Sequence, residues 1–172
     1  DVILAHQRLK PVGNRINKAG AKTRAMELLE RVRLPNPERQ FDSYPHELSG
    51  GMRQRILIAQ ALSGHPKILI ADEPTTALDV TIQAQILDLI KDLINELGLS
   101  VVLITHDLGV VASICTRVVI MYAGQVVEDA SVTEIFDNPK HPYTKGLLAA
   151  VPHPTQHAST LTGIPGNLPN LL

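Results

Sequence analysis

Two adjacent carboxylates end an apolar stretch of the sequence. Residues 68–74 are ILIADEP, so Asp72 and Glu73 directly follow a run of aliphatic side chains. A histidine, His106, follows a second aliphatic run in residues 100–107, SVVLITHD. In nucleotide hydrolysis, Asp72 could hold a magnesium ion through water, Glu73 could accept a proton from the attacking water, and His106 could contact a terminal phosphate. Asp72-Glu73 alone, or His106-Asp107 alone, would more often simply end a strand and face solvent. The presence of both pairs, each after an apolar strand, favours a catalytic role.

The segment LSGG (48–51) places a serine and two glycines before an apolar run. Ser49 is a typical N-cap residue and predicts a largely buried helix that extends to Leu62, before Gly64 and Pro66. Glycines let a backbone approach a ligand closely, and a helix N-terminus presents free N–H groups to an anion. From the residues alone, a phosphate contact and a simple capped turn are equally compatible with this segment.

Nucleotide hydrolysis also needs a loop that holds the phosphates, of the form G-x-x-x-x-G-K-[ST], between a strand and a helix. The segment nearest to this form is GNRINKAGAKT (13–23), in which Ala21 separates Gly20 from Lys22. Its glycine spacing is wrong, and no apolar strand precedes it. The sequence therefore combines carboxylates suited to nucleotide chemistry with no phosphate loop.

The elements that must position these side chains alternate between strand and helix. Residues 67–74 and 100–107 are short apolar runs, and the first predicts a strand buried on both faces. Between them, residues 79–98 carry apolar side chains at helical spacing and end in glycine. This order predicts an α/β fold, a parallel sheet with crossover helices. Ligands bind beyond the carboxyl ends of such strands, where the two polar pairs would meet at one rim.

Further elements are expected on either side of this core. Residues 21–34 have apolar side chains at helical spacing, and the proline-rich residues 35–45 predict a loop. Residues 117–130 predict two β segments hinged at Ala123-Gly124, and two short helices follow. The tail from Pro152 is rich in proline, glycine and asparagine and predicts irregular structure.

Composition limits the classes of function. The chain has 172 residues, and its formal net charge is −1, which gives no electrostatic case for nucleic-acid binding. No apolar run approaches the ~20 residues of a membrane span. His141, His153 and His157 are expected to be exposed loop histidines, not metal ligands. The single cysteine, Cys115, is expected to be a small buried residue.

Four motifs together resemble the ATP-binding cassette (ABC) transporter ATPases. LSGGMRQR (48–55) resembles their signature motif, ILIADEP their Walker B strand, TALD (76–79) their D-loop, and ITHD (104–107) their histidine switch. All four occur in the order of that family. The fold implied is a partial P-loop NTPase with a helical subdomain, and the cofactors implied are ATP and Mg2+.

The resemblance implies a role for each matching residue. Asp72 would be the magnesium ligand, Glu73 the catalytic base and His106 the switch histidine. In this family two subunits hold ATP between them head to tail, so the signature motif of one closes on the ATP held by the other. Asp79 would contact that second subunit. The residues implied to contact ATP in trans are Leu48, Ser49, Gly50, Gly51 and Gln54.

Longer matches resemble one subfamily, the dipeptide, oligopeptide and nickel importers, and within it the D-type ATPase subunit. They are YPHELSGGMRQR, IMYAGQ, HPYTKGLL and the tail LTGIPGNLP. The implied partners are a second ATPase subunit, transmembrane permease subunits and, indirectly, a solute-binding protein, at the cytoplasmic face of the cell membrane. No residue indicates which solute is carried.

The resemblance also implies a division of the chain. Residues 1–65 would form the helical subdomain, 66–137 the catalytic core, and 138–172 the start of the C-terminal extension. The family's Walker A loop, adenine-stacking aromatic residue and Q-loop precede the signature motif and have no counterpart here, since Gln7 stands in a helical context. We therefore expect a piece of a longer ATPase that is inactive in isolation. A non-functional remnant, or a DNA-repair or translation ATPase of the same family, remain alternatives.

Overall fold

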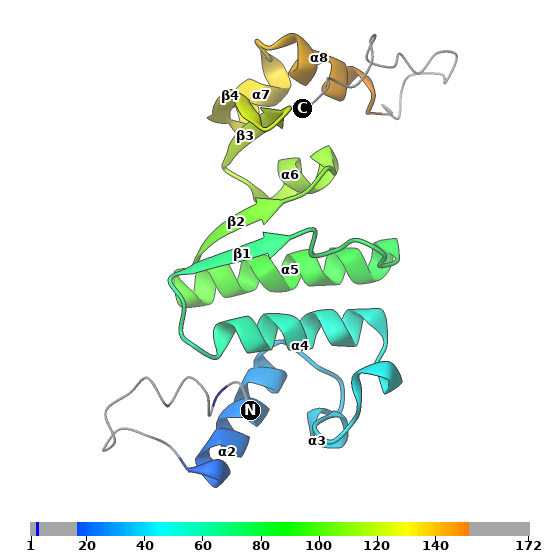
Figure 1. The fold of residues 1–172 in the computed structure, drawn as a ribbon, viewed down its shortest axis with the longest axis vertical. Coiled ribbons are helices and arrows are strands. Elements are labelled where there is room, and N and C mark those ends of the chain that lie inside the picture. Colours follow the sequence, from blue (N-terminus) through cyan, green and yellow to red (C-terminus); the bar gives the residue numbers. More distant parts are fainter. Residues whose placement is uncertain (1–2, 4–16, 152–172) are drawn as a thin grey trace. The chain divides into compact units, whose positions relative to one another are not determined.

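The computed structural model describes Ile3 and residues 17–151 (Figure 1). The chain divides into two compact units, Asp1–Ile104 and Thr105–Leu172, and each is described by itself below. The three-part division at residues 65 and 137 stays a prediction. In the first unit the elements are α2 (Lys18–Arg31), α3 (Pro37–Gln40), the 3-10 helix η2 (Pro45–Glu47), α4 (Gly50–Leu62), β1 (Ile68–Asp72), α5 (Val80–Leu97) and β2 (Ser100–Ile104).

Helix α5 supplies the core of the first unit. Its apolar stripe is at most 1% exposed and consists of Ile86, Leu89, Ile90 and Leu93. The helix ends at Gly98, whose φ of 62° is the left-handed conformation that commonly terminates helices. Helices α4 and α5 lie side by side, and the two strands run along α5 (Figure 1). Both helices predicted here, from Ser49 and from Asp79, are confirmed.

The strands β1 and β2 pair in parallel, as predicted. Ile68 stands opposite Ser100 and Asp72 opposite Ile104, so both strands end at the same level. The expectation that the β1 strand is buried on both faces is wrong. Leu69 is buried, but Ile70 on the opposite face is 67% exposed. Successive side chains of a strand point to opposite faces, and the described helices cover the face that carries Leu69.

The proline-rich segment 35–45 is not entirely a loop. It contains the one-turn helix α3, which begins at Pro37 after Asn36 in a left-handed conformation (φ 50°). Proline at the first helical position costs no hydrogen bond, since the N–H there has no partner within the helix. The prolines of this segment were interpreted as loop signals only, so this short helix was not predicted.

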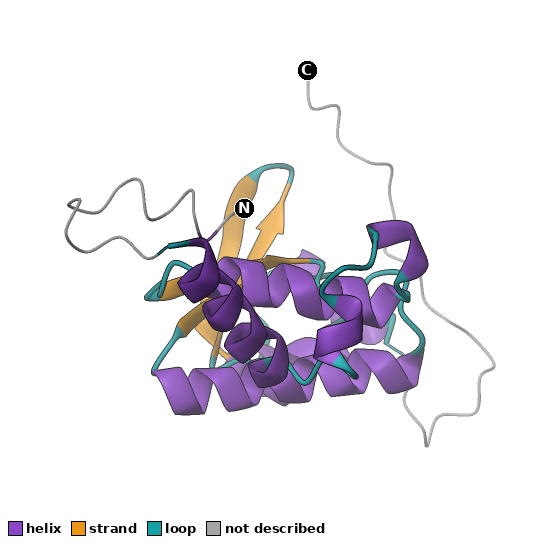
Figure 2. Cartoon of the chain, turned by 90° about the horizontal axis from the view of Figure 1, so that it is seen from below, coloured by secondary structure: helices purple, strands orange, loops and turns teal. Residues whose placement is uncertain are grey.

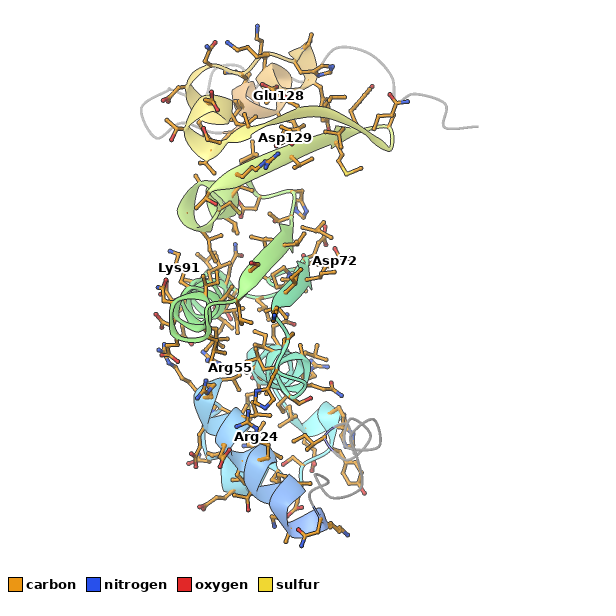
Figure 3. All side chains as sticks on the ribbon, turned by 90° about the vertical axis from the view of Figure 1, so that its left-hand side faces the viewer. Arg24, Arg55, Asp72, Lys91, Glu128 and Asp129 are labelled. Atoms are coloured by element: carbon orange, nitrogen blue, oxygen red, sulfur yellow. The ribbon has the colours of Figure 1, made fainter. Side chains whose placement is uncertain are left out.

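The buried Arg55 joins three helices of the first unit. From α4, its Nη1 donates to the carbonyl oxygen of Val32 at the end of α2 (2.8 Å), and its Nη2 donates to Oε1 of Gln85 on α5 (3.2 Å; Figure 3). Burial, and then the nearby charge of Arg33, lower the pKa of the Arg55 guanidinium. The hydrogen bonds compensate part of the cost of burying this charge.

The second unit is built around a β-hairpin. Its elements are α6 (Leu108–Ile114), β3 (Arg117–Tyr122), β4 (Gln125–Ser131), α7 (Val132–Asp137) and α8 (Pro142–Ala149). Strands β3 and β4 are antiparallel (Figure 2), and the predicted hinge at Ala123-Gly124 is confirmed as the turn, with φ values of 49° and 76°. Such positive values are typical of two-residue hairpin turns. The core contains Val111, Val118, Ile120 and Ile135.

Cys115 packs half-buried against this core, and burial raises the pKa of its thiol. His141 is also half-buried, so the expectation of an exposed loop histidine is wrong for it. Its Nδ1 accepts a hydrogen bond from the backbone N–H of Tyr143 (3.1 Å) and caps α8. His153 and His157 lie outside the described residues.

The carboxylate of Glu128 fastens the start of α8 to β4 (Figure 3). Its two oxygens accept hydrogen bonds from the backbone N–H groups of Lys140 (2.7 Å) and His141 (3.0 Å). The hydroxyl of the buried Thr144 is the largest cause of the lowered pKa of Glu128, followed by the Lys140 N–H, although this hydroxyl is outside standard hydrogen-bond geometry. The segment that continues to α8 thus depends on one negative charge.

We expect Glu128→Gln to loosen this attachment. The pKa of Glu128 in the folded chain lies below its unfolded value of 4.5, so its stabilising contribution is present above that value and is lost as the pH falls through the folded pKa. Hydrogen exchange at neutral pH should show faster exchange of the Lys140 and His141 amides in the variant. Asp137→Asn, a change to an exposed carboxylate of α7, is the control. Unchanged protection in Glu128→Gln, or equal loss in the control, would contradict this role.

Candidate active site

Asp72 and Glu73 occupy the carboxyl end of β1 and are both exposed. The backbone N–H of Glu73 donates to the carbonyl oxygen of Ile104 (2.9 Å), so pairing with β2 extends one residue beyond the strand. Glu73 itself has a φ of 44°, a left-handed conformation that residues other than glycine rarely adopt. Such a conformation costs about 1–3 kcal/mol and is frequent at functional sites.

A hydroxyl holds the carboxylate of Glu73. Oγ1 of Thr76 donates to Oε2 of Glu73 (3.0 Å), and the backbone N–H of Thr76 donates to the carbonyl oxygen of Glu73 (3.2 Å). One residue further, Ala77 also has a left-handed φ, of 64°. Thr76 was not singled out in the sequence, because a hydroxyl three residues from a carboxylate gives no signal until the turn between them is known.

Asp79 has a structural task at the start of α5. Its Oδ1 accepts a hydrogen bond from the backbone N–H of Ile82 (3.0 Å), and its carbonyl oxygen accepts one from Gln83 (2.8 Å). This is the geometry of an N-cap. The contact with a second subunit expected for Asp79 stays a prediction.

The segment that resembles the signature motif forms the N-cap and the first turns of α4. Oγ of Ser49 accepts a hydrogen bond from the backbone N–H of Met52 (3.3 Å), which confirms Ser49 as the N-cap. Leu48 is buried, Gly50 is exposed and Gly51 is buried. The segment Ser49–Gly51, the N-cap and first two residues of α4, is here called the signature turn. It lies against the segment that follows Glu73, since a Cβ atom placed on Gly50 would stand 3.1 Å from Cδ2 of Leu78.

Gln54 lies one turn further along α4, away from the signature turn. It is half-buried and lines a mainly apolar groove with Leu57, Ile70 and Asp72. A direct contact between Gln54 and ATP stays a prediction. The structure thus brings Asp72, Glu73, Asp79 and the signature motif together in one compact unit.

His106 belongs to the second unit, where it is exposed. The residue after it, Asp107, caps α6 by accepting hydrogen bonds from the N–H groups of Gly109 (2.8 Å) and Val110 (3.2 Å). The expectation that His106 meets Asp72 and Glu73 at one rim stays a prediction.

The end of β1 fits a magnesium ion of the kind that accompanies a nucleotide. Mg2+ usually takes one or two carboxylates, keeps several waters, and is bound through the phosphates of the substrate. Asp72 offers one exposed carboxylate. In residues 17–151 no group of three or more His, Cys, Asp or Glu side chains could form a cage made of protein ligands alone. Asp72 would hold the ion through one carboxylate and water.

Solved structures of ATP-binding cassettes resemble this fold. The chain aligns with cbiO1 of Clostridium perfringens, part of the ABC transporter complex cbiONQ, with a TM-score of 0.65 and 30% identity, over 80% of this chain and 52% of that one. It aligns with the dimeric, post-hydrolysis cassette MJ0796 bound to ADP and Pi with a TM-score of 0.63 and 34% identity, over 76% and 54%. The fold is therefore that of an ABC ATPase, and the α/β prediction is confirmed.

Family models and curated relatives identify the group more closely. The model of the ABC transporter family matches residues 2–76, and that of the oligopeptide/dipeptide transporter C-terminal region matches residues 127–172. The oligopeptide transport ATP-binding protein OppD of Bacillus subtilis (strain 168) is 59% identical over 91% of this chain. OppD of Lactococcus lactis subsp. cremoris (strain SK11) is 56% identical over 87% of it.

The chain belongs to the ABC transporter ATP-binding proteins, in the branch that carries the oligopeptide/dipeptide transporter C-terminal region. It spans about half the length of the curated relatives it matches, 44% of each OppD. None of the helices described in residues 17–151 has the length and apolar character needed to cross a membrane.

Two variants at Asp79 should separate capping from any role of its charge. Asp79→Ala removes the acceptor for the Ile82 N–H and should lower the free energy of unfolding by about 0.5–2 kcal/mol. Asp79→Asn keeps an acceptor at the same position and should change it by only a few tenths of a kcal/mol. Denaturant unfolding of the chain measures both. If Asn destabilises as much as Ala, the negative charge rather than the cap stabilises α5.

Proposed function

We propose that this chain is part of the ATP-hydrolysing subunit of an importer for peptides. The observation that carries the proposal is the position of the Glu73 carboxylate, which accepts a hydrogen bond from Thr76. It stands beside Asp72 at the end of β1 in a left-handed conformation, fixed by the Ile104 carbonyl and the Thr76 hydroxyl. The relatives quoted above are named as oligopeptide transport ATP-binding proteins, which supports peptides as the class of solute.

In the proposed reaction water attacks the terminal phosphorus of ATP, the bond from that phosphorus to the bridging oxygen breaks, and ADP leaves together with inorganic phosphate. Glu73 accepts a proton from that water, while Thr76 keeps the carboxylate oriented. Asp72 would hold Mg2+, which would neutralise phosphate charge when it is bound. His106 contacts the terminal phosphate. The phosphates of this ATP are cradled by a loop outside the 172 residues.

The signature turn serves a second nucleotide. Ser49 and the exposed N-terminus of α4 would contact ATP held by a second ATPase subunit, in a head-to-tail pair. Leu48 is buried and would act by fixing the turn. The subunit pair would dock on transmembrane permease subunits at the cytoplasmic face of the cell membrane and receive peptide from a solute-binding protein. The formal net charge of the chain is only −1, so no electrostatic attraction favours nucleic acid as a partner.

Glu73→Gln in a full-length subunit that carries these 172 residues tests the catalytic role. The amide keeps the shape of the side chain but cannot accept the proton, so ATP hydrolysis should fall by roughly 10²-fold or more while ATP binding persists. Glu96→Gln, at an exposed carboxylate of α5, is the control and should leave the rate unchanged. Phosphate release and nucleotide binding are measured side by side. A Glu73→Gln variant that retains the parent rate would contradict the assignment.

The 172-residue chain without its upstream partner segment should hydrolyse ATP negligibly, because it has no phosphate loop. Phosphate release by the purified chain measures this directly. Saturable hydrolysis by the isolated chain that is lost on Glu73→Gln would show that the missing loop is not required and would contradict the proposed division of labour.

A further inference from the structure

The second glycine of the signature motif, Gly51, packs directly against the start of α5. A Cβ atom placed on Gly51 would stand 2.6 Å from Cγ2 of Ile82. Real Cβ atoms essentially never come this close to another heavy atom, so any side chain at residue 51 would force Ile82 or one of the two helices to move. The close approach of α4 to α5 therefore depends on glycine here.

The backbone gives no other reason for glycine at this position. Gly51 lies inside α4, after the N-cap Ser49. Among the described residues, Gly98 and Gly124 are the glycines with a left-handed φ. Alanine would suit the helical backbone of residue 51 better than glycine does. The space occupied by Ile82 is thus the structural constraint on residue 51.

Ile82 also receives the cap of its own helix. Its backbone N–H donates to Oδ1 of Asp79 (3.0 Å), while its Cγ2 faces Gly51. On the other side, the signature turn is closed by the hydrogen bond from Met52 N–H to Ser49 Oγ. An unbroken chain of contacts therefore runs from Asp79 through Ile82 and Gly51 to Ser49.

We propose that Gly51 is a positioning residue that joins the signature turn to the turn at Asp79, so that both are presented to the second subunit as one rigid block. Ile82 is the contact that transmits position between them. This inference rests on the proposed function, in which the signature turn faces the second ATPase subunit, and on the predicted contact of Asp79 with that subunit. It assigns Gly51 a role beyond leaving room for a nucleotide.

The space around Gly50 is less tightly constrained than the space around Gly51. A Cβ atom there would stand 3.1 Å from Cδ2 of Leu78, the end of a flexible side chain that can turn aside. The methyl group of Ile82 that faces Gly51 is instead a branch on the β-carbon, and β-branched side chains in helices are nearly fixed at χ1. Relief at Gly51 is therefore expected from shortening Ile82 and from no other change nearby.

The test is a rescue experiment in a full-length subunit assembled with its partner. Gly51→Ala should lower kcat for ATP hydrolysis by roughly 10- to 100-fold, as expected when a small displacement spoils the alignment of reacting groups. It should leave KM for ATP nearly unchanged, because the phosphates are held by the other subunit. In the double variant Gly51→Ala/Ile82→Ala, the nearest remaining atom, Cβ of residue 82, is at an ordinary contact distance of 3.9 Å, and most of kcat should return.

Val80→Ala is the matched control for the second substitution. Val80 is also β-branched and begins the same helix, but it is 82% exposed and is not among the atoms that face Gly51. Combined with Gly51→Ala, it should restore nothing. Failure of Ile82→Ala to restore kcat, or equal rescue by Val80→Ala, overturns the proposal, since the added methyl group would then act on the nucleotide or by general loosening.

The thermal unfolding of the 172-residue chain separates this proposal from the proposed function. Gly51→Ala should lower the melting temperature on the order of 5 °C, and Ile82→Ala should cost much less in that background than it does in the parent. If the parent subunit shows no ATP hydrolysis that depends on Glu73, the proposed function is wrong. The proposed effect of Gly51 on kcat is then wrong as well. Strictly additive effects on unfolding would instead refute the Gly51–Ile82 contact itself, whatever the activity.

Discussion

The burial of one helical stripe is the interaction on which the first unit depends. Ile86, Leu89, Ile90 and Leu93 of α5 are at most 1% exposed, so α5 contributes the most completely buried surface in the unit. Each of these side chains contributes about 1.5–3 kcal/mol when it leaves water, whereas a typical neutral hydrogen bond contributes about 0.5–1.5 kcal/mol. The turns that carry Asp72, Glu73 and Ser49 are short, and they are ordered because they connect elements that pack around this stripe.

Polar contacts then set the geometry that the apolar core leaves open. Arg55 fixes the end of α2 and the side of α5 relative to α4. Ser49 and Asp79 cap the two helices at their N-termini, and Thr76 orients Glu73. The residues expected to do chemistry are therefore exposed, while the residues that position them are buried or hydrogen-bonded. Such a division is typical of functional sites, whose exposed residues are positioned by a rigid scaffold.

Much of this could be predicted from local sequence. Ser49, Asp79 and Gly98 mark helix ends through short-range backbone chemistry, and Ala123-Gly124 marks a hairpin turn in the same way. The predictions that were wrong, and the contacts that were not predicted, depend on packing between segments that are distant in the sequence. The exposed face of β1 follows from which helices cover the sheet, and neither the Arg55 hydrogen bonds nor the fit of Ile82 against Gly51 could be predicted without the packing of α4 on α5. Pro37 is a local signal that was interpreted as part of a loop, although proline is also favoured at the first position of a helix.

In the proposed function this chain carries parts of two different nucleotide sites: Asp72 and Glu73 serve one ATP, and the signature turn serves another. A structure of the full-length subunit with its partner, with Glu73→Gln and bound Mg2+ and ATP, tests it most directly. Asp72 and residue 73 should lie beside the terminal phosphate of the ATP held by their own subunit. Oγ of Ser49 should lie about 3 Å from a phosphate oxygen of the ATP held by the partner. A structure in which both groups face the same nucleotide, or in which the signature turn contacts none, would contradict it.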